Sequence, residues 1–306
     1  MGNASWLGLR IDNGNPESAN MADAADPEAI GFDTLRIVAD GASGRIVVSD
    51  SLSYGISRIT VDDVVVGSSF AGAATIVIPL AQGAKAVIAH DAGIGKDQAG
   101  ISGLPFGDRH GLPVAAVAGN TASLSNGNSL YEGTISHANK LATELGVRAG
   151  QSVGEAARLM LKAPRGRAID ATREIEFVLR KMQETPKGRI YAVWNLFGLP
   201  DTYPNDVFAL ATHSARVAAE HAFRWNVKGW IANDAGMAMN NSGIAGLALC
   251  AEKGMPAAAV SAESARIGDG MSTYEDGIIS AANEVAARKG VSVGMTAKTA
   301  LEIMLS

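Results

Sequence analysis

The chain has 306 residues, of which 47% are hydrophobic and 19% are charged, and its formal net charge at pH 7 is −5. This length suffices for one large globular domain or two ordinary ones, and the composition excludes an intrinsically disordered chain. The net negative charge, without a Lys/Arg run interleaved with aromatic residues, argues against nucleic-acid binding.

Targeting signals and cysteine usage favour the cytoplasm. The N-terminal sequence has no cationic start followed by an apolar stretch, and no run of about 18 uninterrupted apolar residues occurs. The single cysteine, Cys250, has no partner for an intrachain disulfide, and its apolar surroundings predict a buried structural role. We therefore expect a cytoplasmic protein that does not span a membrane.

The first predicted elements alternate between strand and helix. Residues 1–43 match no other part of the chain and are treated as a separate N-terminal segment. The apolar run at 62–69 predicts a strand, and 70–83 has the length of a helix with a glycine stop. Residues 84–93 read as a buried strand that ends in polar residues.

The same alternation continues toward the middle of the chain. A helix is predicted at 98–111 and a strand at 112–119, followed by a glycine-rich loop at 119–133 and a helix from 134 to 145. The next helix starts at Ser152 with a capping-box pattern. This order of elements is typical of a parallel sheet flanked by helices.

The chain contains an internal repeat. Residues 91–132 align without gaps onto 234–275 with 17 identities in 42 positions, and 133–150 continues onto 277–294 after a shift of one residue. A repeat of about 120 residues is a domain-sized duplication rather than a solenoid unit. We therefore predict an internally duplicated α/β fold, in which two βαβαβ-type halves with parallel sheets are related by a pseudo-two-fold axis.

The predicted organisation has four parts. Residues 1–43 are the N-terminal segment, 44–162 the first α/β repeat, 163–187 a connector and 188–306 the second α/β repeat. Within the connector, the sequence IDATREIEFVLRKMQ predicts an amphipathic helix over 169–183.

Ligands of open parallel sheets bind at the carboxyl ends of the strands, where the loops gather. The first such loop holds Ser68 and Ser69 before a predicted helix, so its N–H groups and hydroxyls predict a site for a carboxylate or phosphate. The alternative is that Ser69 caps the helix. In the second repeat, Thr212 and His213 are taken as the matching residues.

The second loop carries His90, which we expect to bind substrate, and Asp91. Asp91 corresponds to Asp234, and both are followed by Ala-Gly. An Asp at a strand end often accepts N–H groups of its own turn. Because ionisable residues surround Asp91, a catalytic role is the second interpretation.

Charged residues differ between the two copies of this loop. Lys96 and Asp97 of the first copy are replaced by Met239 and Asn240 in the second. A charge pair in a loop is usually a solvated surface feature. Here the pair lies in a glycine-containing segment at the predicted ligand edge, so a catalytic role is an equal alternative.

The third loop shows the opposite difference. Arg266 and Asp269 stand where the first copy has Ser123 and Asn126, and Gly268 directly precedes Asp269. Glu275 and its counterpart Glu132 persist in both copies. We expect Arg266, Gly268 and Glu275 to bind substrate and Asp269 to take part in catalysis.

These complementary differences suggest one composite site. If the loop edges of the two sheets face each other, Lys96 and Asp97 meet Arg266 and Asp269. If the halves pack through their helices, each half keeps its own cleft. The sequence leaves both arrangements open.

Several common chemistries lack their motifs. The histidines show no metal-ligand spacing, and no CxxC, no GxSxG and no P-loop ending occurs, so we expect no metal and no cofactor. Aromatic residues are enriched in the second copy, where one or two are candidates for a pocket wall: Trp194, Phe197, Tyr203, Phe208, Phe223, Trp225 and Trp230.

The leading functional hypothesis is a small-molecule hydrolase that acts on a C–N bond (amide, imide or lactam) of a polar metabolite bearing a carboxylate or amide. In it, Lys96, Asp97, Asp91 and Asp269 move protons, Arg266 orients a carboxylate, and helix N-termini stabilise an oxyanion. An isomerase or lyase that abstracts a proton next to a carbonyl needs the same groups, and a non-catalytic metabolite-binding or regulatory protein is a further alternative. The expected partner is the small-molecule substrate, with no nucleic acid and no membrane, and homo-oligomerisation is left open.

Overall fold

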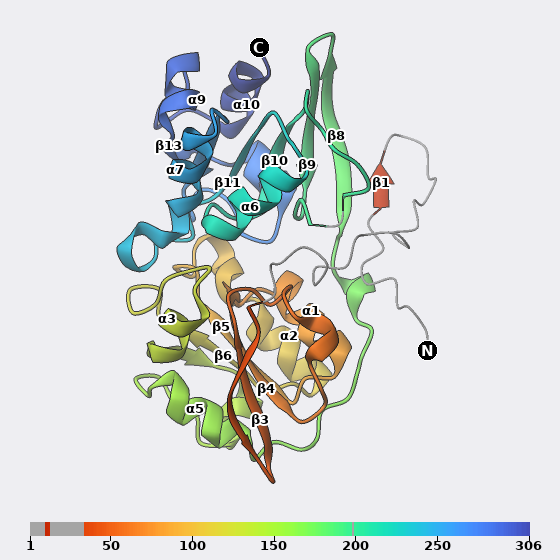
Figure 1. The fold of residues 1–306 in the computed structure, drawn as a ribbon, viewed down its shortest axis with the longest axis vertical. Helices are drawn as coiled ribbons and strands as arrows, with labels where there is room; N and C mark the ends of the chain where they lie inside the picture. Colours follow the sequence, from red (N-terminus) through yellow and green to blue (C-terminus); the bar gives the residue numbers. More distant parts are fainter. Residues whose placement is uncertain (1–9, 13–33, 198) are drawn as a thin grey trace.

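The computed structural model describes residues 10–12, 34–197 and 199–306. These residues form two mixed sheets, and in each sheet strands that follow one another in the chain, from β2 to β7 and from β8 to β13, lie side by side (Figure 1). The first sheet has six strands: β2 (Arg36–Gly41), β3 (Gly44–Ser49), β4 (Asp63–Phe70), β5 (Ala86–His90), β6 (Val114–Val117) and β7 (Ile135–Ala138). The second has seven: β1 (Arg10–Asp12), β8 (Val178–Thr185), β9 (Gly188–Val193), β10 (Val207–His213), β11 (Gly229–Asn233), β12 (Ala257–Val260) and β13 (Ile279–Ala282).

Helices occur at corresponding places in the two halves. Those of the first are α1 (Ala73–Gln82), α2 (Gly103–His110), α3 (Gly127–Glu132), α4 (Lys140–Glu144) and α5 (Val153–Met160). Those of the second are α6 (Arg216–Arg224), α7 (Ala245–Glu252), α8 (Gly270–Glu275), α9 (Glu284–Lys289) and α10 (Ala297–Leu305). The structure therefore has an α/β fold in two similar halves.

The prediction of purely parallel sheets is wrong at the edges. Strands β3 to β6 run parallel, but β2 pairs antiparallel with β3, and β7 pairs antiparallel with β6. The second sheet repeats this pattern with β8 and β13. The turn between Gly41 and Gly44 is too short for a crossover, so β2 and β3 can only pair as a hairpin. The first sheet thus begins within the segment that the sequence separates as residues 1–43.

The predicted helix at 169–183 is also wrong. The chain forms a short 3₁₀ turn at Thr172–Glu174 and then strand β8, which turns back into β9 where Thr185 pairs with Gly188. Strand β8 supplies backbone partners to β9, whose outer edge would be left unpaired by a helix. Phe177 and Val178 at its start also favour a strand over a helix.

The predicted helix over 134–145 is two elements rather than one. Residues 135–138 form strand β7, and only the shorter α4 is helical. The predicted start of the next helix is confirmed, because the Ser152 hydroxyl accepts the N–H of Glu155 at the N-terminus of α5.

Alternating side chains of each sheet enter two different hydrophobic layers. In the first half, Val65 and Val87 face α1 and α2, whereas Val64 and Ile88 face α3, α4 and α5. In the second half, Phe208 packs toward α6 and α7, and the opposite layer packs toward α8, α9 and α10. Each sheet therefore lies between helices on both faces, which leaves the strand ends and their loops to form sites.

The two halves meet through the loops at the carboxyl ends of their strands (Figure 1). The N–H of Lys96 donates to the carbonyl of Ala262 at 2.8 Å, and the N–H of Met239 donates to the carbonyl of Ala122 at 3.2 Å. One hydrophobic cluster also contains residues of both halves, among them Phe70, Trp194, Ala235 and Ile267. This is the loop-to-loop arrangement that the composite-site interpretation requires.

Within the described part of the chain, no helix combines the length and the apolar character needed to cross a bilayer.

Candidate functional site

The loops after β5 and β11 have nearly the same backbone but different charges. Asp97 and Gln98 adopt φ values of 54° and 56°, and Asn240 and Asn241 adopt 57° and 56°. Asn and Asp tolerate this left-handed region better than most residues. Because the uncharged copy folds in the same way, the charge of Asp97 is not required for the loop conformation.

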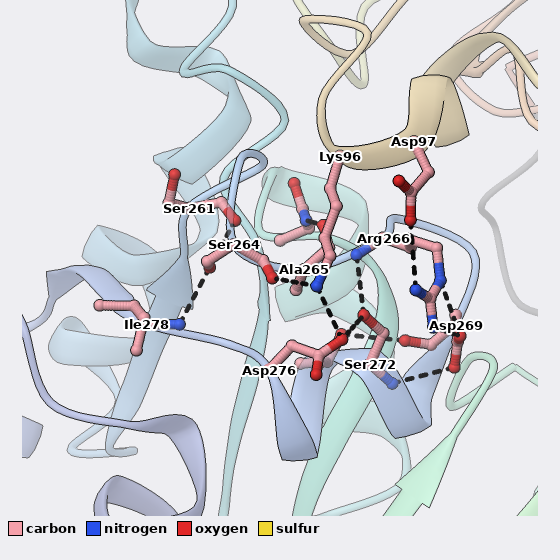
Figure 2. Close-up of polar contacts among 12 residues, drawn as sticks. Lys96, Asp97, Ser261, Ser264, Ala265, Arg266, Asp269, Ser272, Asp276 and Ile278 are labelled. Atoms are coloured by element: carbon pink, nitrogen blue, oxygen red, sulfur yellow. Dashed lines mark hydrogen bonds and ion pairs between the residues drawn. The ribbon is translucent and has the colours of Figure 1, made fainter.

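Lys96 reaches across the interface to the second half (Figure 2). Its ammonium donates to the Asp276 carboxylate at 3.0 Å and to the carbonyl oxygen of Ser264 at 3.2 Å. Asp276 also accepts the Ser272 hydroxyl at 2.8 Å. The Ser272 hydroxyl and then Lys96 lower the pKa of Asp276, so this side chain is a carboxylate at neutral pH.

Arg266 lies beside this pair and contacts carboxylates of both halves (Figure 2). Its guanidinium donates twice to Asp269, at 3.0 and 3.3 Å, and once to Asp97, at 3.3 Å. These contacts, with Asp269 first, raise the pKa of Arg266. The other oxygen of Asp269 accepts the N–H of Ser272 and caps α8. We call Lys96, Asp97, Arg266, Asp269 and Asp276 the charged interface cluster.

A small pocket of about 60 Å³ lies next to the cluster and shares Asp269 with it. Trp194 and Asp269 line it together with Glu176 and Arg180, which contact each other. The remaining lining residues are Val178, Ala192, Val193, Gly268, Gly270 and Met271. Trp194 is therefore the predicted aromatic residue that lines this pocket.

The structure ties two predicted site residues to backbone groups. Asp91 is buried at the end of β5, and one of its carboxylate oxygens accepts the N–H groups of Gly93 and Gly119, each at 3.0 Å. Asp234 at the end of β11 accepts two N–H groups in the same way. The predicted equivalence of Asp91 and Asp234 is confirmed, and both close their own turns.

His90 is fully buried beside Asp91. Its Nδ1 accepts the N–H of Ala92 at 2.9 Å, so Nε2 carries the proton and donates to the carbonyl of Ala122 at 3.1 Å. Burial lowers the pKa of His90, which keeps the imidazole neutral. Both ring nitrogens are thus occupied by backbone groups.

The helix-cap interpretation of Ser69 is wrong. Helix α1 begins at Ala73 after the N-cap Gly72, whereas the Ser69 hydroxyl accepts the N–H of Leu52 at 2.9 Å. The Ser68 hydroxyl donates to the carbonyl of Ser123 at 3.0 Å. Both serines are buried, and these hydrogen bonds join their hydroxyls to residues outside helix α1.

The assumed counterparts of Ser68 and Ser69 shift by one residue. Phe70 pairs with His90 in the first sheet, and His213 pairs with Asn233 in the second. His213 therefore corresponds to Phe70, and Thr212 corresponds to Ser69.

Of two other predicted site residues, one lines the pocket and the other lies outside the charged interface cluster. Gly268 has φ +94°, donates its N–H to Ala211 and lines the pocket. Glu275 is exposed at the end of α8 and does not join the charged interface cluster, and its neighbour Asp276 takes that place. Asp276 is the extra residue behind the one-residue shift between the copies, so the alignment itself carried the signal that identifies it.

Cys250 is fully buried, as predicted, and burial raises the pKa of its thiol to about 12. Among the described residues, no group of three or more His, Cys, Asp or Glu side chains is placed to hold a metal ion. The chain matches no protein-family model, no curated protein and no solved structure.

Proposed function

We propose that the chain is an enzyme that hydrolyses a C–N bond, in an amide, imide or lactam, of a small metabolite that carries a carboxylate. The reaction takes place at the charged interface cluster and the pocket lined by Trp194. The observation that carries this proposal is that cations and carboxylates of both halves meet at the strand ends beside a pocket.

The second half acts as an internal control for the scaffold. Lys96 and Asp97 correspond to Met239 and Asn240 in a loop of the same conformation. Asp276 has no counterpart at all. The common fold does not need these charges, which favours a ligand-related role over a purely structural one.

Arg266 is suited to hold a ligand carboxylate. Asp269 fixes the guanidinium with two contacts, whereas Asp97 makes a single contact of 3.3 Å and its side chain is 64% exposed. A ligand carboxylate therefore replaces Asp97 at the outer nitrogen at little cost, and Asp269 keeps the guanidinium aimed. This exchange releases Asp97 next to the bound ligand.

The released Asp97 and the fixed Lys96 complete the proposed reaction. Asp97 takes a proton from a water molecule, and the resulting hydroxide forms a bond to the carbonyl carbon of the ligand. The Lys96 ammonium, held by Asp276, stabilises the oxyanion of the tetrahedral intermediate. When the intermediate collapses, the C–N bond breaks and the leaving nitrogen takes the proton back from Asp97.

The test uses a panel of linear amides, cyclic imides and lactams that each carry a carboxylate, with the released amine or new carboxylate as readout. For a substrate found in the panel, Lys96→Met and Asp97→Asn lower kcat by roughly 10²–10⁴-fold, the usual contribution of a proton-transfer or oxyanion group. Arg266→Lys raises KM, because a lysine ammonium cannot contact Asp269 and the ligand carboxylate with the fixed planar geometry of the guanidinium. Arg165→Lys is the matched control, since Arg165 makes a similar two-pronged contact to Asp62 on the surface. Full turnover by the Lys96 and Asp97 variants contradicts the proposal.

A non-catalytic metabolite-binding protein is the second candidate. It is favoured by the mutual pairing of the charges in the cluster and by the small volume of the pocket. Lys96→Met separates the two: in an enzyme turnover falls while binding persists, and in a binding protein only the affinity falls. An isomerase or lyase is distinguished by a different readout. It exchanges the proton next to the substrate carbonyl with solvent, and it does not hydrolyse the amide.

A further inference from the structure

A second polar cluster joins the two halves on other elements. Asp50 follows β3, and Arg216 and Glu220 belong to α6. One terminal nitrogen of Arg216 donates to Asp50 at 2.8 Å, and the other pairs with Glu220. The Tyr54 hydroxyl contacts the second oxygen of Glu220 at 3.4 Å. We call Asp50, Tyr54, Arg216 and Glu220 the Arg216 cluster.

Each member of the central ion pair is also held from outside the pair. The Asp50 oxygen that does not contact Arg216 accepts the N–H of Gly127 at 2.8 Å. Arg216 keeps Glu220 and also donates to the carbonyl of Ser125 at 2.8 Å. If a ligand inserts between Asp50 and Arg216, each side chain can therefore keep its contacts on the side away from the pair, and only their mutual contact is broken.

The corresponding place in the other half shows that the fold packs without these charges. The residues that align with Asp50, Arg216 and Glu220 lie after the matching strand or in the matching helix, and they are apolar: Trp194, Ala73 and Val77. Replacing a buried ion pair by well-packed apolar residues is often neutral or stabilising, so stability alone is a weak reason for such a network between two packed halves. The charges therefore call for a ligand-related explanation.

The charge pattern selects the class of ligand. The cluster has one cation and two carboxylates, and the side chains of Asp50, Arg216 and Glu220 are 25%, 38% and 20% exposed, so they are reachable from solvent but partly shielded. A simple anion would face two carboxylates, and a simple cation would face the guanidinium. A ligand with both charges replaces one ion pair by two.

We infer that the Arg216 cluster binds a small zwitterion with the ammonium and carboxylate groups of a free amino acid. Its carboxylate lies against the guanidinium of Arg216, and its ammonium donates to the oxygen of Asp50 that now contacts Arg216. Glu220 and Tyr54 hold the guanidinium in place. This site is separate from the charged interface cluster, and the inference does not depend on the proposed hydrolase activity.

The experiment is calorimetric titration of the full chain with each of the twenty common amino acids at millimolar concentration, and with acetate and methylamine as probes that carry only one of the two charges. At least one amino acid is expected to bind, with an affinity at least about tenfold higher than either single-charge probe, a factor that one lost ion pair readily supplies. Absence of binding by all twenty, or equal binding of acetate or methylamine, overturns the inference.

Two variants locate the binding. Asp50→Asn keeps the contact to Gly127 and is expected to weaken amino-acid binding at least about tenfold, whereas Asp62→Asn, which removes a carboxylate from a surface ion pair, leaves it unchanged. Arg266→Lys also leaves it unchanged, which separates this inference from the proposed activity. Unchanged binding by the Asp50 variant, with the fold verified by thermal unfolding, overturns the assignment.

Discussion

Lys96 of the first half and Asp276 of the second form an ion pair with 3.0 Å between nitrogen and oxygen, and neither residue has a charged counterpart in the other half. Both side chains are about one-third exposed, at 31% and 36%. Ion pairs with this much solvent contact contribute about 0–1 kcal/mol to stability. The pair is therefore too weak to explain its presence by stability alone.

The first prediction concerns Lys96→Met, which introduces the residue found at the corresponding position of the second half. We expect the free energy of unfolding to change by less than about 1 kcal/mol, while turnover or ligand binding at the charged interface cluster is lost. Urea denaturation measures the first quantity, and a double-mutant cycle with Asp276→Asn measures the coupling of the pair. A destabilisation well above the expected limit would show that the pair serves to hold the halves together.

The second prediction concerns Gly93, which lies against its counterpart Gly236 at the centre of the interface. A Cβ atom on Gly93 would lie 2.9 Å from the Cα of Gly236, and the φ of Gly93 is +72°. Gly93→Ala therefore combines backbone strain with a steric overlap that neither backbone can relieve, and we expect it to cost roughly 2–4 kcal/mol of stability.

Gly111 supplies the matched control for this substitution. Its φ is +73°, but a Cβ there would meet nothing within 4 Å. Gly111→Ala thus carries the backbone strain alone, about 1 kcal/mol. Denaturation midpoints of the two variants should differ clearly, and equal values would show that the halves do not meet at Gly93 as the structure has it.

The third prediction concerns the response of the fold to acid. Burial lowers the pKa of His213 to about 4 and the pKa of His221 to about 3. In the unfolded chain a histidine titrates near its usual value of about 6.5. As the pH falls from that value toward 4, the unfolded chain takes up protons that the folded protein does not.

The free energy of unfolding is therefore expected to fall with pH across this window, by roughly 3 kcal/mol for His213 alone at about 1.4 kcal/mol per pKa unit. His213→Gln should flatten this dependence relative to the unmodified protein. The free energy of unfolding of each protein is measured relative to its own value at pH 8, where the histidines are neutral in the folded and the unfolded state. The same slope in the variant would show that His213 does not cause the acid sensitivity.

The positions of the loops were predictable because hydrophobic periodicity places strands and the parallel order gathers their carboxyl ends at one edge. The sequence thus indicated that Lys96, Asp97, Arg266 and Asp269 belong to such loops, and the structure brings them together. It did not decide whether the halves meet through loops or helices, since either face can form such an interface.

Other features depend on information that local patterns do not contain. Residues 178–185 are a short segment with several charged side chains, and their pattern also fits an amphipathic helix. They form a strand because they pair with the edge of β9, which would otherwise have no partner on that side. Asp50 and Arg216 are 166 positions apart, and their contact exists only because of how the halves dock. Glu275 matches Glu132 of the first copy whereas Asp276 matches no residue, so comparison of the two copies favours Glu275 although Asp276 makes the contact to Lys96.

The last prediction decides the role of Asp91, for which turn closure and catalysis were both open. Asp91 and Asp234 each accept two N–H groups with one carboxylate oxygen. Replacing either by Ala leaves two N–H groups in a buried turn without their acceptor, at a cost of roughly 3–6 kcal/mol for two hydrogen bonds to a carboxylate. Because the contacts are equivalent, we expect Asp91→Ala and Asp234→Ala to destabilise the protein to a similar extent.

Asn retains an acceptor oxygen at this position, so Asp91→Asn and Asp234→Asn should be much milder and should remain folded. If Asp91 only closes its turn, the two Asn variants also retain equal turnover or ligand binding, and this is the result that the geometry predicts. A selective loss of turnover in Asp91→Asn, with thermal unfolding matched to Asp234→Asn, would instead assign Asp91 to catalysis.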